Sequence, residues 1–184
     1  MNKTIFIVFS VILSFSLTSC ALTKFAGHYK SVDKKSGRLN GQVYTTNFNS
    51  YRIGILSNDW KRINIKGGDL AFYNSSFDAS ITTNSTCQKE KRRYSLKALS
   101  NSLVTGIKNK EIKIRENIKV DLSQGLYSQY SAELNNENIA LATVVYKSEK
   151  CNYDFSYSST YNKFEKNLPT FKNFISSFNE INAK

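Results

Sequence analysis

Two stretches with a helical period interrupt a chain that otherwise alternates apolar and polar residues, and this order restricts the fold. Residues 94–109 repeat leucine and isoleucine at spacings of three and four, which is typical of an amphipathic helix. Residues 168–180 carry a second apolar stripe, with Pro169 placed for a first helical turn. Strand-like alternation precedes each stretch. We therefore expect a single α+β domain, a mainly antiparallel sheet with two packed helices.

The predicted strands form two groups, one before each helix. Gly67 and Gly68 mark a hairpin-type break in the first group. The polar joint at 135–138 links two long strands in the second group, which predicts an antiparallel hairpin. The expected strands cover residues 51–55, 62–66, 69–73 and 78–84 in the first group, and 111–120, 126–134, 139–147 and 151–157 in the second.

The first residues of the chain have the pattern of an export signal. Lys3 precedes an apolar stretch, residues 5–17, that is shorter than the roughly 20 residues a membrane-spanning helix needs. Small residues follow the stretch, so residues 1–19 are interpreted as a secretory signal peptide. A short anchor or a buried helix is the alternative. Neither explains why charge is absent from residues 4–23 and frequent afterwards.

The signal ends in Leu17-Thr18-Ser19-Cys20, which resembles the bacterial lipobox. The resemblance implies a thioether bond from Cys20 to diacylglycerol, cleavage before Cys20, and acylation of the new N-terminus with a chain such as palmitate. Two or more acyl chains anchor a protein stably to a membrane. Ala21 stands where aspartate would retain such a protein at an inner membrane, which favours an outer-membrane location facing the periplasm. An ordinary cysteine at a signal-peptide end is the alternative.

The mature chain divides into a tether and a domain. Residues 20–41 are polar and show no sustained apolar period, so they are predicted to form the lipidated N-terminus and a flexible tether of roughly 25 Å span. Residues 42–184 are predicted to form the single α+β domain.

The other two cysteines are Cys87 and Cys151. In an exported chain an even remainder predicts a disulfide, which would stabilise the fold by about 4 kcal/mol on the chain-entropy model. Two buried reduced thiols are the alternative.

The chain is basic, with a formal net charge of +12. Such a charge favours acidic partners or anionic surfaces, and export argues against nucleic acid. A basic run before the first helix is a candidate for binding anionic head groups. Its alternative role is a solvated loop that keeps the protein soluble. The cations of this run are Lys89, Lys91, Arg92 and Arg93.

The chain offers few residues for catalysis. His28 is the only histidine and lies in the predicted tether, where it cannot be held beside a nucleophile. A zinc site needs three or four nearby ligands, so no metal or cofactor is expected. Paired carboxylates would be the remaining route to a hydrolase, and the expectation is a non-enzymatic protein. The carboxylates in or beside apolar strands are Asp69, Asp78, Asp121 and Asp154.

Aromatic residues are frequent in the second half of the chain. They could line an open sheet face that takes an acyl chain or a peptide, as in a carrier of lipid or another hydrophobic ligand. Packing against the C-terminal helix explains most of them equally well. The set comprises Tyr127, Tyr130, Tyr146, Tyr153, Phe155, Tyr157 and Tyr161.

Several short motifs resemble a family of small bacterial lipoproteins, often encoded near MCE/Mla-type lipid-transport systems. The motifs are DLAF at 69–72, Cys87, LKALSNSLVTGI at 96–107, KCNYDF at 150–155 and FKNFISSF at 171–178. The resemblance implies an accessory or binding protein for lipid transport or envelope maintenance, with an envelope protein complex as a candidate partner and no catalytic residues to carry over. The order of strands and helices also resembles the PsbP-like α/β sandwich, a fold better known for binding than for catalysis.

Overall fold

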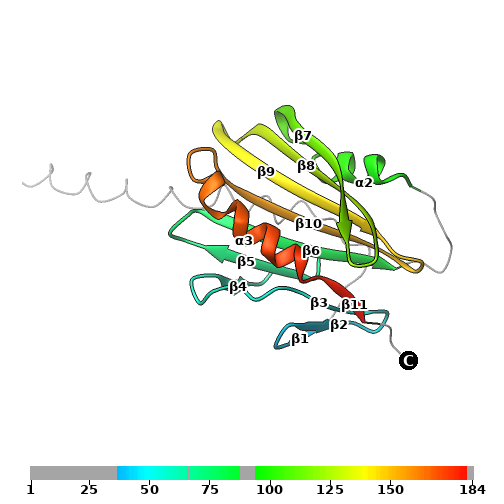
Figure 1. The fold of residues 1–184 in the computed structure, drawn as a ribbon. Helices are drawn as coiled ribbons and strands as arrows, with labels where there is room; N and C mark the ends of the chain where they lie inside the picture. Colours follow the sequence, from blue (N-terminus) through cyan, green and yellow to red (C-terminus); the bar gives the residue numbers. More distant parts are fainter. Residues whose placement is uncertain (1–36, 66, 88–93, 182–184) are drawn as a thin grey trace, which may run out of the picture.

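The structure is a computed structural model, and it describes residues 37–65, 67–87 and 94–181. Its main layer is a seven-stranded antiparallel sheet in the order β4-β5-β6-β10-β9-β8-β7. A smaller sheet, β1-β2-β3-β11, lies beside it, and the helices α2 and α3 complete the domain (Figure 1). The expected α+β class with a mainly antiparallel sheet is confirmed. Among the described residues, no helix is long and apolar enough to cross a membrane.

The element bounds extend the predicted pattern at both ends. The structure has three short strands that the sequence did not predict, β1, β2 and β11. The strands are β1 Arg38–Asn40, β2 Val43–Thr45, β3 Ser50–Arg52, β4 Lys61–Ile63, β5 Leu70–Asn74, β6 Ala79–Cys87, β7 Lys108–Val120, β8 Ser123–Leu134, β9 Glu137–Lys147, β10 Cys151–Thr160 and β11 Asn179–Ile181; the helices are α2 Leu96–Leu103 and α3 Phe164–Ser176.

The two helices differ in length and position from the prediction. Ser95 caps α2 by accepting a hydrogen bond from the Ala98 backbone N–H at 3.1 Å. The helix ends at Leu103, before Gly106, whose φ of 85° lies in the left-handed region that glycine favours. The remainder of the predicted helix, 104–109, therefore forms a turn and the start of β7. The C-terminal helix starts four residues earlier than predicted, so Pro169 lies inside it.

The folded chain also begins earlier than the predicted boundary at residue 42. Strand β1 lies within the range assigned to the tether and pairs with β2, Arg38 opposite Thr45. Gly41, with a φ of 56°, makes the tight turn between the two strands. The short β1 is too brief to show a period of two, which is why the sequence pattern does not reveal it.

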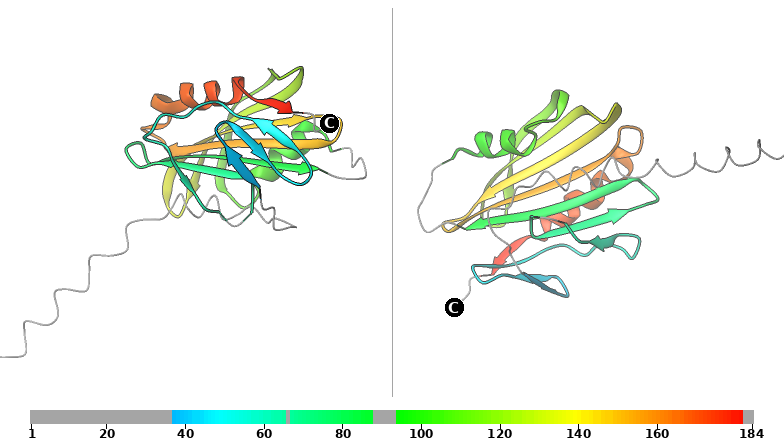
Figure 2. Two further views of the ribbon diagram at one scale, coloured as in Figure 1. Left: turned by 90° about the horizontal axis from the view of Figure 1, so that it is seen from below. Right: turned by 180° about the vertical axis from the view of Figure 1, so that it is seen from behind.

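The two faces of the large sheet are covered by different elements. One face, the α3 face, carries the aromatic side chains of β10, with Tyr157 stacked on Phe171 of α3 at a ring separation of 5.6 Å. The other face, the α2 face, packs against α2 over β8 and β9 through a smaller core that includes Tyr130 and Leu141. Figure 2 shows the two helices on opposite sides of the sheet. The prediction that Ala79, Ile81 and Thr83 share a face agrees with their register.

A disulfide joins β6 and β10, two neighbouring strands in the middle of the large sheet, at one end of these strands. Cys87 and Cys151 lie directly opposite each other in β6 and β10 and form the bond that the sequence analysis expected. Because 64 positions separate them, the bond constrains a long loop of the unfolded chain and is expected to stabilise the fold by about 4 kcal/mol.

Candidate functional site

The strands of the large sheet run between two ends of the domain, which we name the tether pole and the pocket pole. The tether pole holds the turns at 46–49, 121–122 and 148–150 together with the start of β1. Contacts with β11 bring two of these turns together: Asp121 accepts a hydrogen bond from the side chain of Asn179 at 3.0 Å, and Ser148 donates one to Glu180 at 3.2 Å. The pocket pole holds the turns at 135–136 and 161–163.

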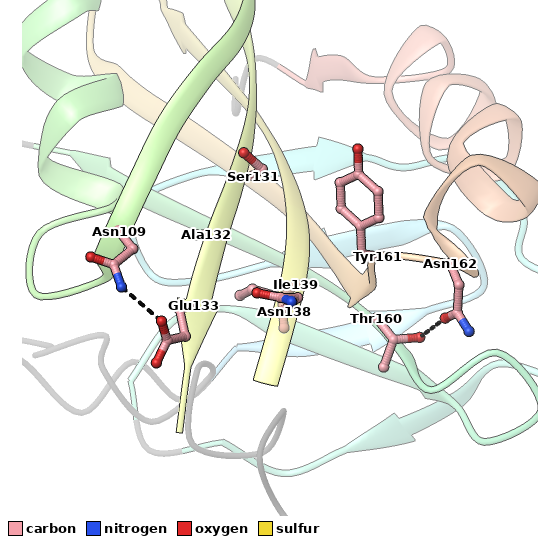
Figure 3. Close-up of a pocket in the computed structure, with 9 residues that line it drawn as sticks. All are labelled: Asn109, Ser131, Ala132, Glu133, Asn138, Ile139, Thr160, Tyr161 and Asn162. Atoms are coloured by element: carbon pink, nitrogen blue, oxygen red, sulfur yellow. Dashed lines mark hydrogen bonds between the residues drawn. The ribbon is translucent and has the colours of Figure 1, made fainter. Parts of the chain in front are cut away.

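A cavity of about 490 Å³ lies at the pocket pole (Figure 3). Its lining includes two buried apolar residues of β8 and β9, Ala132 and Ile139, and the other lining residues carry polar side chains. Its volume lies within the range of small-molecule sites. The nine lining residues, which include one charged side chain, are Asn109, Ser131, Ala132, Glu133, Asn138, Ile139, Thr160, Tyr161 and Asn162.

One rim of this cavity depends on an irregular backbone. Strand β7 has a register shift against β8 between Lys108 and Glu111, and Asn109 within it has a φ of 49°. Asparagine tolerates this left-handed conformation better than most residues. The bulge directs the Asn109 amide to Glu133, to which it donates a hydrogen bond at 2.7 Å.

The opposite rim is formed where β10 turns into α3. Thr160 donates a hydrogen bond to the side-chain oxygen of Asn162 at 3.0 Å. Tyr161 is 60% exposed, and its backbone N–H donates to the Asn138 carbonyl at 3.2 Å. In Figure 3 its ring extends from the turn beside the cavity. The site therefore offers amides, hydroxyls, one carboxylate and an exposed aromatic ring.

The sequence analysis did not identify this pocket, except for Tyr161 as one member of the aromatic set. Its residues come from four separate stretches, each of which looks like an ordinary polar turn. Only the register of β7, β8, β9 and β10 brings them together. A sequence signal does exist in the asparagines at the ends of these strands, but turns use asparagine for conformational reasons as well.

The four candidate carboxylates lie at four different places. Asp69 is buried on the α3 face, while Asp154 points to the α2 face, where it accepts a hydrogen bond from Asn84 at 3.1 Å. Asp78 is in the β5–β6 turn and accepts from Tyr73, and Asp121 is in the β7–β8 turn. The structure does not bring them together as a pair for acid–base chemistry.

Asp69 belongs to a hydrogen-bonded network between the two sheets. Its carboxylate accepts from the hydroxyls of Tyr51, at 2.9 Å, and Ser85, and its backbone N–H donates to the Thr83 carbonyl at 3.0 Å. The Tyr51 hydroxyl also lies 2.9 Å from that of Thr83. Because buried polar groups cost free energy unless they are hydrogen-bonded, this network fixes how the small sheet sits on the large one.

The aromatic set is divided between three environments. Five of its members pack in the main core on the α3 face: Tyr127, Tyr146, Tyr153, Phe155 and Tyr157. Tyr130 lies on the α2 face, where its hydroxyl accepts a hydrogen bond from Arg115 at 2.8 Å. Tyr161 alone of the set is at the pocket. Core packing, the second interpretation of the sequence, therefore accounts for most of the set.

The basic run with Lys89, Lys91, Arg92 and Arg93 falls outside the described residues, and its role as an anionic-surface site stays a prediction. The residues that flank this run, Cys87 and Tyr94, are described. Cys87 ends β6 at the tether pole, and the Tyr94 carbonyl accepts a hydrogen bond from the Lys147 ammonium at 2.8 Å. Cys20 and His28 also lie outside the described residues. In the described ranges no group of three or more potential metal ligands occurs.

Comparisons with known proteins show the fold. No family model matches the chain, and no curated protein matches it in sequence. Among solved structures, cyanobacterial PsbP (CyanoP) from Synechocystis sp. PCC 6803 is similar with a TM-score of 0.57 at 16% identity, over 84% of this chain and 98% of that one. The expected PsbP-like architecture is thereby confirmed.

Two further solved structures share the fold. LpqN of Mycobacterium tuberculosis, described as involved in cell envelope biogenesis, has a TM-score of 0.57 at 10% identity, over 81% of this chain and 91% of that one. A protein from Bacteroides thetaiotaomicron has a TM-score of 0.52 at 12% identity, over 72% of this chain and 45% of its own. Identities this low show a common architecture and nothing about activity.

The buried tyrosines predict an alkaline limit to stability. Burial, with the negative charge of Asp69, raises the pKa of Tyr44 to about 12, and burial together with Glu165 and Glu116 raises that of Tyr127 to about 12. Burial also raises the pKa of Tyr51 well above its ordinary value. In the unfolded chain tyrosine ionises near pH 10. The unfolded state therefore loses protons first, and stability should be intact below about pH 10 and fall between about pH 10 and 12.

An absorbance titration of tyrosinate, run beside circular dichroism, measures this effect. We expect part of the tyrosinate signal to develop in one cooperative step together with loss of structure above about pH 10. Complete tyrosine ionisation near pH 10 with the fold retained would contradict the burial of these hydroxyls.

Proposed function

We propose that this protein is a lipid-anchored, non-enzymatic binding protein of the cell envelope that presents its pocket away from the membrane. The observation that carries the proposal is the placement of the pocket and of the first strand at opposite poles. Arg38, the first strand residue, lies in one row with Thr45 and Ser50 at the tether pole. A chain anchored through Cys20 enters the domain at that pole, so the pocket is at the far end.

The anchor is supported by the cysteines. The pairing of Cys87 with Cys151 uses both other cysteines and suits an oxidising compartment outside the cytoplasm. Cys20 then has no intramolecular partner and stands in the lipobox-like LTSC sequence. Ala21 supports the outer membrane as the location. The fold likeness to LpqN, described as involved in cell envelope biogenesis, supports an accessory role in the envelope, as does the family resemblance.

The alternative of a lipid carrier needs an apolar space between the sheet and a helix. In the described part of the chain, that interface is occupied by aromatic rings in contact. Tyr157 lies 4.9 Å from Phe164 and 5.6 Å from Phe171, measured between ring centroids. An acyl chain would have to displace these rings, which makes the polar cavity the better-supported binding site.

The pocket chemistry favours an uncharged ligand rich in hydroxyl and amide groups. Asparagine side chains both donate and accept hydrogen bonds, so they can pair with the donor groups and the acceptor groups of such a ligand. The carboxylate of Glu133, the one charged group in the lining, disfavours an anionic ligand. Tyr161 adds an aromatic face against which the C–H groups of a sugar ring can pack. We propose an N-acetylated oligosaccharide as the ligand class.

The anchor is tested by the mass of protein extracted from membranes of its host. We expect the processed chain to begin at Cys20 and to carry the mass of diacylglycerol and a further acyl chain. Cys20→Ser should abolish this addition, because a serine hydroxyl cannot form the thioether bond to diacylglycerol. An unmodified Cys20 in the wild-type protein would overturn the anchor.

The pocket is tested by titrating tri-N-acetylchitotriose into the mature chain by calorimetry. Loss of one good contact should weaken binding about fivefold to tenfold in Tyr161→Ala and in Asn138→Ala. Tyr94→Ala, which removes an exposed tyrosine at the other pole, serves as the matched control and should bind as wild type. Absence of saturable binding, or binding by Tyr161→Ala as strong as that of wild type, would refute this ligand class.

A further inference from the structure

The tether pole carries exposed apolar side chains at the tips of its turns. Leu122, in the two-residue β7–β8 turn, is 88% exposed, and Phe48, in the β2–β3 turn, is 69% exposed. Tyr94, which precedes α2, is 47% exposed. Apolar side chains this exposed add little to the stability of the fold, because they stay in contact with water. Turns are ordinarily built from polar residues, so three such side chains at one pole call for an explanation.

A series of contacts places Phe48 and Leu122 at the same end of the domain. Asp121, next to Leu122, accepts a hydrogen bond from the Glu180 backbone N–H at 3.3 Å. Glu180 pairs with Tyr51 in the small sheet, one row from Ser50. Phe48 lies two positions before Ser50, in the turn at this end of β3. Figure 1 shows the β7–β8 turn, the β9–β10 turn and the end of β11 gathered on the same side of the molecule.

Tyr94 joins this end through β9. Its carbonyl accepts the hydrogen bond from Lys147, the last residue of β9, and Lys147 pairs with Asn152 beside the disulfide. The three exposed side chains therefore come from separate parts of the chain and share one pole.

The length of chain before the domain places this same pole near the membrane. About 18 residues separate Cys20 from Arg38, and a flexible chain of that length has a typical span of roughly 23 Å. Strand β8, with 12 residues, extends about 40 Å along the domain. This typical span is less than the length of the domain, which favours an orientation with the tether pole closer to the bilayer than the pocket pole.

We propose that Phe48, Leu122 and Tyr94 form a membrane-docking surface that inserts into the interfacial region of the bilayer. This inference rests on the proposed lipid anchor for its geometry, but the contact itself needs no acyl chain. Phenylalanine and leucine gain free energy by leaving water, and tyrosine suits the boundary between head groups and acyl chains. The docked domain stands on the membrane with its pocket facing outward.

Two of the carboxylates near the docking surface, Asp121 and Glu180, are held by the fold. Asp121 accepts two hydrogen bonds from β11, and Glu180 accepts from Tyr153 at 2.9 Å and from Ser148. These two carboxylates keep their protein donors when the domain docks. The apolar side chains at the turn tips are the groups that move from water into the bilayer interface. In the sequence, the cations of the run at 89–93 lie between Cys87 and Tyr94. We expect them to add a preference for anionic lipid.

A vesicle co-sedimentation assay with the mature chain carrying Cys20→Ser tests the docking surface without the anchor. The vesicles are phosphatidylcholine, with and without phosphatidylglycerol. We expect binding to both, and Phe48→Ser and Leu122→Ser should each weaken it about tenfold, because each removes an inserting side chain. Both positions are exposed, so the melting temperature should stay near that of wild type.

Matched controls separate docking from general stickiness. Ile55→Ser removes a 79%-exposed aliphatic side chain away from this pole, and Tyr161→Ser removes an aromatic one at the pocket pole; both should bind as the parent chain. Replacement of Lys89, Lys91, Arg92 and Arg93 by alanine should reduce only the preference for phosphatidylglycerol. The docking surface would be overturned if the Phe48→Ser and Leu122→Ser chains bound vesicles as strongly as the parent chain. It would also be overturned if the charge variant alone abolished binding. Either result would count even if Cys20 is acylated.

Discussion

The packing of Phe178 against four aromatic rings is the interaction on which the arrangement of the domain depends. Its ring lies between 4.9 and 5.8 Å from the rings of Tyr51, Tyr146, Tyr153 and Phe155. These rings belong to the small sheet and to the two central strands of the large sheet, so one side chain joins both layers. Phe178 also connects the end of α3 with β11, which completes the small sheet. Edge-to-face aromatic contacts add to the stability that burial provides.

The same packing determines the two poles. Pairing of β11 with β3 places the end of the described chain in the same small sheet as its beginning, and hydrogen bonds of β11 hold the turns of β7–β8 and β9–β10. At the other end the long hairpin of β8 and β9 and the turn before α3 surround a polar cavity. A buried network around Asp69 and Tyr51 fixes the small sheet in place through hydrogen bonds. One large sheet thus connects the tether pole with the pocket pole.

Much of the fold could be predicted because the long elements repeat their pattern many times. Strands β7 to β10 and both helices carry enough apolar positions to show a period, and the two remaining cysteines allowed a single pairing. The short strands β1, β2 and β11 have three residues each and no such period, so the small sheet escaped prediction. The helix boundaries were misplaced because Gly106 and the stripe that begins at Phe164 decide them through local conformation and packing.

The functional surfaces show a sharper limit of sequence reasoning. The pocket gathers residues from four stretches, and the docking surface gathers Phe48, Tyr94 and Leu122, which are isolated apolar residues in polar surroundings. Only strand register shows that each set shares one end of the domain. The cations at 89–93 were conspicuous in the sequence because charge runs need no fold to be noticed, whereas single exposed apolar residues are common on any surface.

The central claim is that the domain stands on the membrane by its tether pole. Spin labels on the acylated protein in vesicles test it most directly, with one label introduced by Asn47→Cys and another by Tyr161→Cys. The account predicts that the label beside Phe48 collides more often with membrane-dissolved oxygen than with an aqueous relaxing agent, and that the label at the pocket pole does the reverse. Equal accessibility of the two labels, or the opposite order, would contradict the proposed orientation.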